Sequence, residues 1–217
     1  MSEDVSRVLN PLGKKGNRLI AILSFLILIA LITPAQAIDY DDGAKYISGW
    51  DIADSGTDAD LFTSAYDGES VFVFGAGGVI LQSADKGATW VQLESPATSN
   101  LRTSDSVGGA IAVVGDGGAA YLRADGNETW LDISLTLPVD FRGMAMTSAT
   151  SLVAVGPSGV IWQYSNETWI QRDSGVSTDL NEVSFLDATL GMIVGDGGTI
   201  LATDDGGESW EYREAPE

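Results

Sequence analysis

Short apolar runs alternate with glycine-rich stretches along residues 61–217, and the runs are too short for helices. In the last such unit the four runs cover residues 181–186, 191–195, 199–203 and 210–213. The tetrad Gly195-Asp-Gly-Gly198 separates the second run from the third. Apolar runs bounded by Gly and Asp are typical of antiparallel strands joined by tight turns, because Gly readily adopts positive φ. The pattern therefore predicts four strands in each unit of about forty residues.

Tryptophan marks the period of this pattern. Five tryptophans lie 40, 40, 39 and 41 residues apart, at Trp50, Trp90, Trp130, Trp169 and Trp210. Glycine tetrads follow nearly the same spacing and begin at Gly75, Gly115, Gly156 and Gly195. A fixed period near forty residues is typical of stacked or radially arranged units. The density of Gly excludes an α-solenoid, because each Gly inside a helix costs about 1 kcal/mol.

Four-stranded units at this period predict an all-β fold, a β-propeller of about four blades. The blades are expected over about residues 61–95, 101–137, 141–174 and 180–215. Residues 38–60 form an acidic lead-in, where Trp50-Asp-Ile-Ala matches an outer strand alone and Asp54, Asp58 and Asp60 suggest a solvated linker. Two arrangements are left open: a four-bladed ring closed within one chain, and an eight-bladed ring formed by a homodimer.

A second motif precedes the repeated tryptophan. It reads Ser/Thr-x-Asp-x-Gly-x-Thr/Ser-Trp and occurs twice in full, with motif residues Ser83, Asp85, Gly87, Thr89 and Trp90, and Thr203, Asp205, Gly207, Ser209 and Trp210. We expect the Asp carboxylate to accept backbone N–H bonds, the Gly to supply a left-handed residue and the Trp ring to cover the turn. Two degenerate copies lie between them, one with Asp125, Asn127, Thr129 and Trp130, the other with Trp169 but no Asp.

The last unit, including Gly191-Met-Ile-Val-Gly-Asp-Gly-Gly-Thr-Ile-Leu-Ala-Thr-Asp-Asp-Gly-Gly-Glu-Ser-Trp210, closely resembles a repeat of the photosystem II stability/assembly factor-like propellers. The motif before each Trp is similar to the Asp-box, or bacterial neuraminidase repeat. Less strict copies cover roughly residues 61–90, 101–130 and 141–169. The resemblance implies an exported, non-enzymatic β-propeller that binds protein partners or helps to assemble a membrane complex. The chain departs from the seven-bladed family in having four units, and it has no Cys for the lipid of the bacterial lipoproteins.

The N-terminus has the pattern of a secretion signal. Four basic residues within residues 1–18 precede the apolar run 19–32, which is followed by the small-x-small site Ala35-Gln36-Ala37. Cleavage of residues 1–37 as a signal peptide is the favoured interpretation, and an uncleaved signal anchor through residues 19–32 is its rival. Either interpretation places residues 38–217 across the membrane, in a secreted, periplasmic or outer-face location.

The chain carries 31 acidic and 11 basic side chains, a net charge of −20, and the part after residue 37 stands at −22. This acidity excludes a nucleic-acid interface, which needs clustered Lys and Arg. There is no Cys and no His. Disulfides, thiol nucleophiles, Ser-His-Asp triads and ordinary transition-metal sites are therefore excluded. We expect neither a metal nor a cofactor.

Two arginines are candidate partner-binding residues. Arg102 and Arg142 occupy equivalent places in adjacent units, at the start of the innermost strand and near one mouth of a propeller channel. Two cations there would suit an acidic peptide or a carboxylate ligand. The competing interpretation, which we favour, pairs each arginine with a nearby acid such as Asp105 or Asp140.

The alternative function is that of a sialidase-like or other carbohydrate-binding or glycosidase protein, since sialidases also carry Asp-boxes. By that resemblance the chemistry requires three clustered Arg and a Tyr/Glu pair. Arg123 and Arg213 flank Asp-box turns and are expected to be peripheral, so a binding module is favoured. A purely structural envelope component is a third class.

Asn127 and Asn166 begin N-x-Ser/Thr sequons, which predict glycosylation unless they reflect only repeat ancestry.

Overall fold

The computed structural model describes residues 53–214. The predicted signal segment 1–37 and the predicted outer strand at Trp50 lie outside the described residues. The described part consists of four antiparallel sheets of four strands each, which confirms an all-β propeller architecture of about four blades. We call the sheets blades 1 to 4 in chain order.

Each blade is a simple up-and-down meander with its first strand at one edge. Blade 1 comprises β1 (Leu61–Tyr66), β2 (Val71–Gly75), β3 (Ile80–Ser83) and β4 (Val91–Gln92), and blade 2 comprises β5 (Leu101–Val107), β6 (Ala110–Gly115), β7 (Ala120–Arg123) and β8 (Leu131–Asp132). Blade 3 comprises β9 (Gly143–Ser148), β10 (Ser151–Val155), β11 (Ile161–Ser165) and β12 (Thr168–Arg172), and blade 4 comprises β13 (Leu180–Phe185), β14 (Gly191–Gly195), β15 (Ile200–Thr203) and β16 (Glu211–Tyr212).

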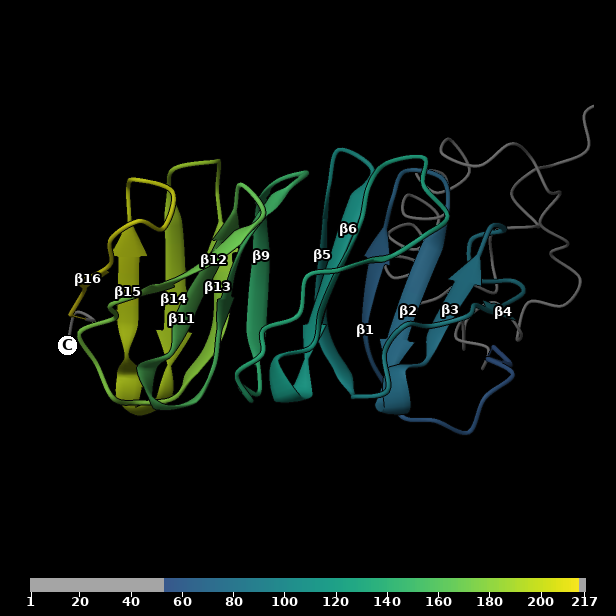
Figure 1. The fold of residues 1–217 in the computed structure, drawn as a ribbon, viewed down its shortest axis with the longest axis horizontal. Coiled ribbons are helices and arrows are strands. Elements are labelled where there is room, and N and C mark those ends of the chain that lie inside the picture. Colours follow the sequence, from purple (N-terminus) through teal and green to yellow (C-terminus); the bar gives the residue numbers. More distant parts are fainter. Residues whose placement is uncertain (1–52, 215–217) are drawn as a thin grey trace, which may run out of the picture. The chain divides into compact units, whose positions relative to one another are not determined.

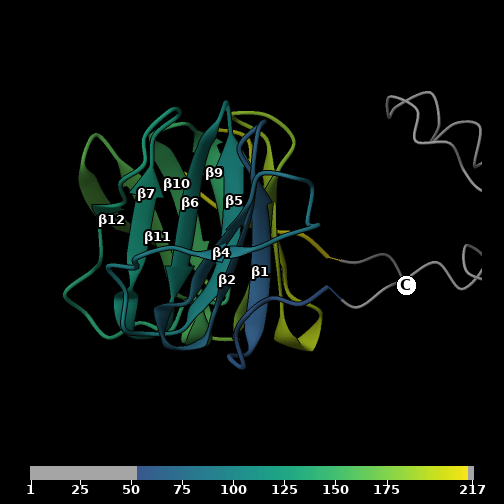
Figure 2. The ribbon, with the colours of Figure 1, turned by 90° about the vertical axis from the view of Figure 1, so that its right-hand side faces the viewer.

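The four blades lie in a row in chain order (Figure 1). The first strand of each blade is the innermost, because β5 contacts both β1 and β9, and β9 contacts β13. Seen along the row, β1, β5 and β9 lie on one side, and strands such as β7 and β12 lie on the other (Figure 2). The inner strands therefore form one continuous wall, to which each blade contributes the beginning of its chain.

The glycine tetrads form the turn between the second and third strand of each blade. In every blade this turn is a short 3-10 segment: η4 (Ala76–Gly78), η5 (Asp116–Gly118), η6 (Pro157–Gly159) and η7 (Asp196–Gly198). Its central residue has positive φ, with values of 63° at Gly77 and 66° at Gly197. Blade 3 has Ser158 at this place with φ of 57°, so this position accepts a side chain although the sequence favours Gly.

Each blade has two faces, and we call the face toward the following blade its C-side face and the face toward the preceding blade its N-side face. Phe72 and Phe74 on the C-side face of blade 1 are fully buried. They meet the Trp130 ring of blade 2 edge-on, at centroid distances of 6.4 Å and 5.6 Å. Trp169 and Trp210 belong to the apolar clusters at the next two junctions. The repeated Trp thus covers the preceding blade as well as its own turn, because its indole is large enough to reach both.

Candidate partner-binding surface

Four side chains at equivalent positions lie where the chain enters each blade. They are Phe62, Arg102, Arg142 and Asn181. In blades 1, 2 and 4 the residue falls at a shift of the register between the first two strands, between Leu61 and Thr63 in the case of Phe62. Such a bulge redirects one side chain out of the alternating pattern of the strand. The two candidate arginines therefore lie at the same end of adjacent blades, as the repeat alignment predicted.

Arg102 is held by an aspartate of its own blade. Its Nε and Nη2 donate to Oδ1 and Oδ2 of Asp116, both at 2.9 Å, in a bidentate pair. The guanidinium also lies 4.6 Å from the centroid of the Phe62 ring. Hydrogen bonds from Arg102, and from Asn100 beside it, lower the pKa of Asp116 despite its partial burial. The arginine side chain remains 40% exposed.

Arg142 reaches instead into the following blade. Its Nη1 donates to Oδ2 of Asp179 at 2.9 Å and to Oδ1 of Asn181 at 3.2 Å. The pKa of Asp179 is lowered first by the N–H bond from Ser158 and then by Arg142. With 42% of its side chain exposed, Arg142 offers part of its guanidinium to solvent. No hydrogen bond involves its Nε or Nη2 within residues 53–214.

The acids that pair with the arginines are not the ones suggested by sequence proximity. Asp105 accepts the N–H of Met146 at 2.8 Å, and Asp140 accepts the N–H of Gly117 at 2.9 Å. Both therefore serve the junctions between blades. The Asp116 carboxylate binds Arg102, while the Asp116 carbonyl accepts the N–H of Ala119 within the turn. Asp196 similarly accepts a bond from Asn181.

One hydrogen bond recurs at each junction between blades. The central residue of a tetrad turn donates its N–H to the side chain just before the next innermost strand: Gly77 to Asn100 at 3.0 Å, Gly117 to Asp140 at 2.9 Å, and Ser158 to Asp179 at 2.9 Å. These bonds tie the turn of one blade to the start of the next. These bonds hold rigidly the end of the blades at which Arg102 and Arg142 lie, which we call the arginine end. The arginine end is therefore preorganised for contact with a partner.

The two complete Asp-boxes form the expected network. Asp85 Oδ1 accepts the N–H of Thr89 at 2.8 Å, and its Oδ2 accepts the Thr89 hydroxyl at 2.6 Å. Gly87 has φ of 91° and lies against the Trp90 ring. The Thr89 and Ser83 groups lower the pKa of Asp85 to about 2. Asp205 makes the equivalent bonds to Ser209 and Thr203, which hold its pKa well below the usual range.

The degenerate copies differ from this pattern. In the second copy no hydrogen bond joins Asp125 to Thr129 within the described chain, and the left-handed residue is Gly126 rather than the expected Asn127. The reason is that Arg123 stands where the complete boxes have Ser or Thr, so the hydroxyl that braces the Asp is missing. In the third copy Asn166 and Glu167 both have positive φ and form a two-residue hairpin. Such a pair is favourable for an Asn-containing I′ turn.

The two sequons lie in exposed turns. Asn127 follows Gly126 in the degenerate box, and Asn166 is the first residue of the β11–β12 hairpin turn. Both asparagines are solvent-exposed in the described chain. Their glycosylation remains a prediction, because repeat ancestry accounts for both sequences.

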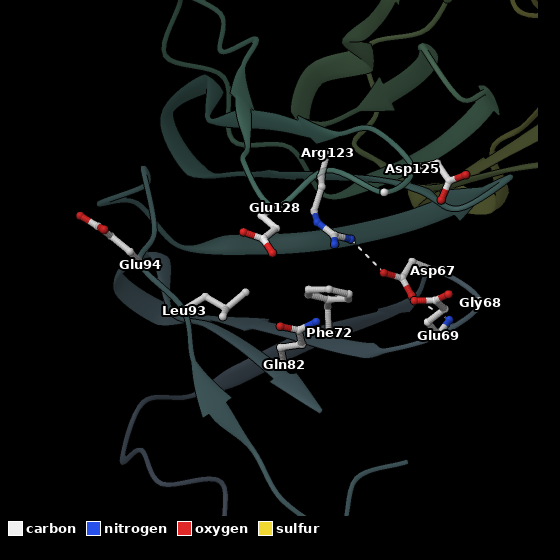
Figure 3. Close-up of a pocket in the computed structure, with 11 residues that line it drawn as sticks. Asp67, Gly68, Glu69, Phe72, Gln82, Leu93, Glu94, Arg123, Asp125 and Glu128 are labelled. Atoms are coloured by element: carbon white, nitrogen blue, oxygen red, sulfur yellow. Dashed lines mark hydrogen bonds and ion pairs between the residues drawn. The ribbon is translucent and has the colours of Figure 1, made fainter. Parts of the chain in front are cut away.

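A cavity of about 760 Å³ opens between blades 1 and 2, and Arg123 lies in its lining (Figure 3). Arg123 was expected to be peripheral, but this expectation is wrong, because the residue is only 9% exposed. Its Nη1 donates to Asp67 Oδ2 at 2.9 Å, and its guanidinium lies 4.7 Å from the Phe72 ring centroid. Four further carboxylates line the cavity beside Gln82 and Leu93: Glu69, Glu94, Asp125 and Glu128. Sequence reasoning missed this pair because its members are 56 residues apart.

The remaining arginines do not join the first two. Arg172 donates to Oε1 of Gln163, and Arg213 pairs with Glu211 at a site where its side chain is 58% exposed. A cluster of three arginines is therefore absent from the part of the chain that the structure describes. In that same part, no group of three or more acidic side chains is placed to hold a metal ion. A search of these residues for a helix long and apolar enough to cross a membrane found none.

Comparison with known proteins connects this geometry to a family. Residues 161–217 match the family model described as "Photosynthesis system II assembly factor YCF48". A search of curated protein sequences found no match. Among solved structures, the computationally designed Ika4 protein aligns over 71% of this chain and 97% of its own, with 14% identity and a TM-score of 0.58.

Two further structures are similar. The extracellular domain of the hybrid two component system BT4673 from B. thetaiotaomicron aligns over 73% of this chain and 22% of its own, with 11% identity and a TM-score of 0.56. YCF48 bound to D1 peptide aligns over 71% of this chain and 66% of its own, with 15% identity and a TM-score of 0.48, so the chain spans less than two thirds of that structure. At these identities the likeness concerns the fold. The comparisons thus confirm a resemblance to the photosystem II assembly factor-like β-propellers with Asp-box repeats, with the family match lying over residues 161–217.

Proposed function

We propose that this chain is an exported, non-enzymatic module that binds a protein partner through the arginine end of its blades. The observation that carries the proposal is the placement of Arg102 and Arg142 at one end of adjacent blades, each with two-fifths of its side chain exposed. The family description as an assembly factor supports a role in bringing proteins together. Export rests on the N-terminal sequence pattern.

The chemistry of this end favours a partner with an acidic segment. Half-exposed ion pairs contribute only about 0–1 kcal/mol, so exchanging Asp116 or Asp179 for a carboxylate of the partner costs little. A guanidinium accepts a carboxylate in bidentate geometry, and Phe62 offers an adjacent exposed ring for an apolar neighbour. An acidic peptide with one apolar side chain matches both features. The net charge of −20 disfavours any such contact elsewhere on the surface.

Binding to defined peptides tests the proposal. The probes are immobilised peptides containing Asp and Glu, each matched with a version in which Asn and Gln replace the acids. We expect the full chain to prefer the acidic version, with roughly tenfold weaker binding for Arg102→Ala/Arg142→Ala. Arg213→Ala is the control, since that arginine forms an exposed ion pair elsewhere. Equal binding to both versions, or no effect of the double substitution, would reject the proposal.

A further inference from the structure

The last blade of the row exposes a face that the other three blades bury. Met192 and Val194 on the C-side face of blade 4 are 52% and 44% exposed. The equivalent residues of the other blades are all fully buried: Phe72, Phe74, Ala112, Val114, Val153 and Val155. The exposed face also contains an apolar hollow of about 470 Å³, lined in part by Leu186 and Leu190. Blade 4 therefore presents the chemistry of a blade junction to solvent.

The tetrad turn of blade 4 lacks, among the described residues, the segment that covers the equivalent turns of the other blades. In blades 1 to 3 the last Gly of the turn lies under the connector that leads to the next blade, so close to a connector carbonyl that no Cβ would fit. These contacts are Gly78 with Ala97, Gly118 with Leu137, and Gly159 with Val176. At Gly198 no atom lies within 4 Å of the corresponding position. We call the site at the last Gly of each tetrad turn, where the connector packs, the Gly cradle. Among the described residues, no connector occupies the cradle at Gly198 in blade 4.

Blade 1 carries the complementary features at the other end of the row. Leu61 begins the innermost strand and is 40% exposed, whereas Leu101, Phe141 and Leu180 at the same position are 0%, 1% and 0% exposed. Asp60 precedes it at the place where Asn100, Asp140 and Asp179 accept the junction bond from a preceding turn. Within residues 53–214 the Asp60 carboxylate accepts no hydrogen bond, and the Gly197 N–H of blade 4 donates none. The Asp60 carboxylate and the Gly197 N–H are therefore the acceptor and the donor of one further junction bond.

The segment before blade 1 is already folded as a connector. Gly56 N–H donates to Asp54 Oδ1 at 2.9 Å, and the Ser55 hydroxyl donates to the Thr57 carbonyl at 3.1 Å. The connector into blade 4 makes the same two bonds at the same distances, from Gly175 to Asp173 and from Ser174 to Val176. Gly56 and Gly175 also have nearly equal φ, 71° and 67°. The acidic lead-in is therefore not simply a solvated linker: its last part has the conformation that elsewhere occupies a Gly cradle.

We propose that two copies of this chain associate head to tail, with blade 1 of each copy docked on blade 4 of the other. The connector 54–60 of one copy fills the Gly198 cradle of its partner, and Leu61 and the blade 1 tryptophan, Trp90, cover Met192 and Val194. Gly197 donates to Asp60 across the contact, as Gly117 donates to Asp140 within the chain. Two identical contacts related by a twofold axis close a ring of eight blades, which lies within the range of known propellers.

A second copy is the occupant that the described chain favours. The connector 54–60 and the cradle at Gly198 belong to the same chain but are not in contact within it. The blade 4 surface exposes the apolar side chains of Met192 and Val194, with the polar Glu182 and Ser184 beside them in the strand register. The exposed Leu61 is an apolar counterpart on blade 1, and burial of such apolar area is typical of a permanent interface. A heterologous contact of this kind satisfies both ends of every chain only when the ring closes.

Engineered disulfides test the arrangement, and the chain offers a clean background because it contains no Cys. The full chain carrying only Asp60→Cys and a differently tagged full chain carrying only Gly197→Cys are produced together and oxidised. We expect a disulfide-linked product that contains both tags. Gly117→Cys with Asp140→Cys in one chain is the geometric control, because their hydrogen bond at 2.9 Å defines the same junction. Leu131→Cys with Asp60→Cys is the negative control, since Leu131 is exposed on the outer part of blade 2.

The outcomes separate the possible arrangements. A single chain that carries both Asp60→Cys and Gly197→Cys is oxidised in parallel. A link formed only within that chain, and not between differently tagged chains, would overturn the proposal in favour of a four-bladed ring. With the chain that carries both substitutions, a ladder beyond two chains would replace the closed ring with an open filament. Absence of any link between the singly substituted chains, beside a successful control, would remove the contact. As an independent measurement, Met192→Arg/Val194→Arg should convert a dimer into single chains by native mass spectrometry. Leu131→Arg should leave the dimer intact.

Discussion

Arg123 in blade 2 donates to Asp67 in blade 1 across 2.9 Å, with about nine-tenths of each side chain buried. The pair joins the β1–β2 turn of blade 1 to the end of β7 in blade 2, and the aromatic ring of Phe72 lies against the guanidinium. The burial of Asp67 raises its pKa, but N–H bonds from Ser70 and Glu69, together with Arg123, outweigh burial and lower it. The pair therefore stabilises the junction only while both partners are present and charged.

Replacement of Arg123 by Met should destabilise the protein by about 3 kcal/mol, because the substitution leaves a buried carboxylate without its cation. The free energy of unfolding in urea at pH 7 measures the effect. Arg213→Met is the matched control, since its ion pair is largely exposed and should contribute at most about 1 kcal/mol. Equal effects of the two substitutions would show that the Asp67 contact contributes no more than a surface pair.

The complete Asp-boxes make stability depend on pH in the acid range. The pKa of Asp85 is lowered from 3.8 to about 2, so the folded state binds its proton more weakly than the unfolded state does. The stability from this group is present above the unfolded pKa and is lost as pH falls through the folded value. We expect the destabilisation by Asp85→Asn to be constant near neutral pH and to shrink between about pH 4 and pH 2.

Urea unfolding of both variants over that pH range provides the measurement. Asp125→Asn is the control, because Asp125 lies at the equivalent position but makes no such bonds to Thr129 in the described chain. Its effect should be small and nearly independent of pH. A pH-independent effect of Asp85→Asn would mean that the turn depends on shape rather than on carboxylate charge.

The repeat, the blade count and the two complete Asp-boxes follow from local sequence, because Gly, Asp and Trp act within a few residues of one another. Asp85 and Thr89, for example, are only four residues apart. The ion pairs of Arg123 with Asp67 and of Arg142 with Asp179 were beyond this reasoning because they join separate blades. Arg142 binds Asp179 rather than Asp140 because blade 3 is followed in space by the start of blade 4. For these two arginines, the packing of one repeat on the next decides which acid the guanidinium meets.

The last Gly of the tetrad turn has the same backbone φ in blades 3 and 4, but a methyl group added to it would have different neighbours in the two blades. Gly159 and Gly198 both have φ of 76°, so Ala at either position carries the same left-handed strain of about 1 kcal/mol. At Gly159 the methyl group would also collide with the Val176 carbonyl, which at Gly198 has no counterpart within one chain. Gly159→Ala should therefore destabilise the single chain by at least about 1 kcal/mol more than Gly198→Ala.

This comparison is made by urea unfolding in the Met192→Arg/Val194→Arg background, so that only the single chain contributes. In the unmodified background Gly198→Ala should additionally weaken association between copies. If both substitutions were equally costly in the single chain, the cradle of blade 4 would already be occupied from within it.

The repeated tryptophans differ in whether their indole N–H has a hydrogen-bond partner among the described residues. Trp169 Nε1 donates to the Ile133 carbonyl at 2.5 Å, whereas the buried Nε1 of Trp130 has no hydrogen-bond partner among the described residues. Trp169→Phe removes both ring area and a hydrogen bond, and it leaves a carbonyl without its donor. Trp130→Phe removes ring area but relieves an unsatisfied donor. Because an unpaired buried group costs about 1–3 kcal/mol, Trp169→Phe should be the more destabilising of the two by about that amount. Parallel thermal and urea unfolding of the two variants checks this order, and the reverse order would show that contact with Phe72 and Phe74 outweighs the hydrogen bond.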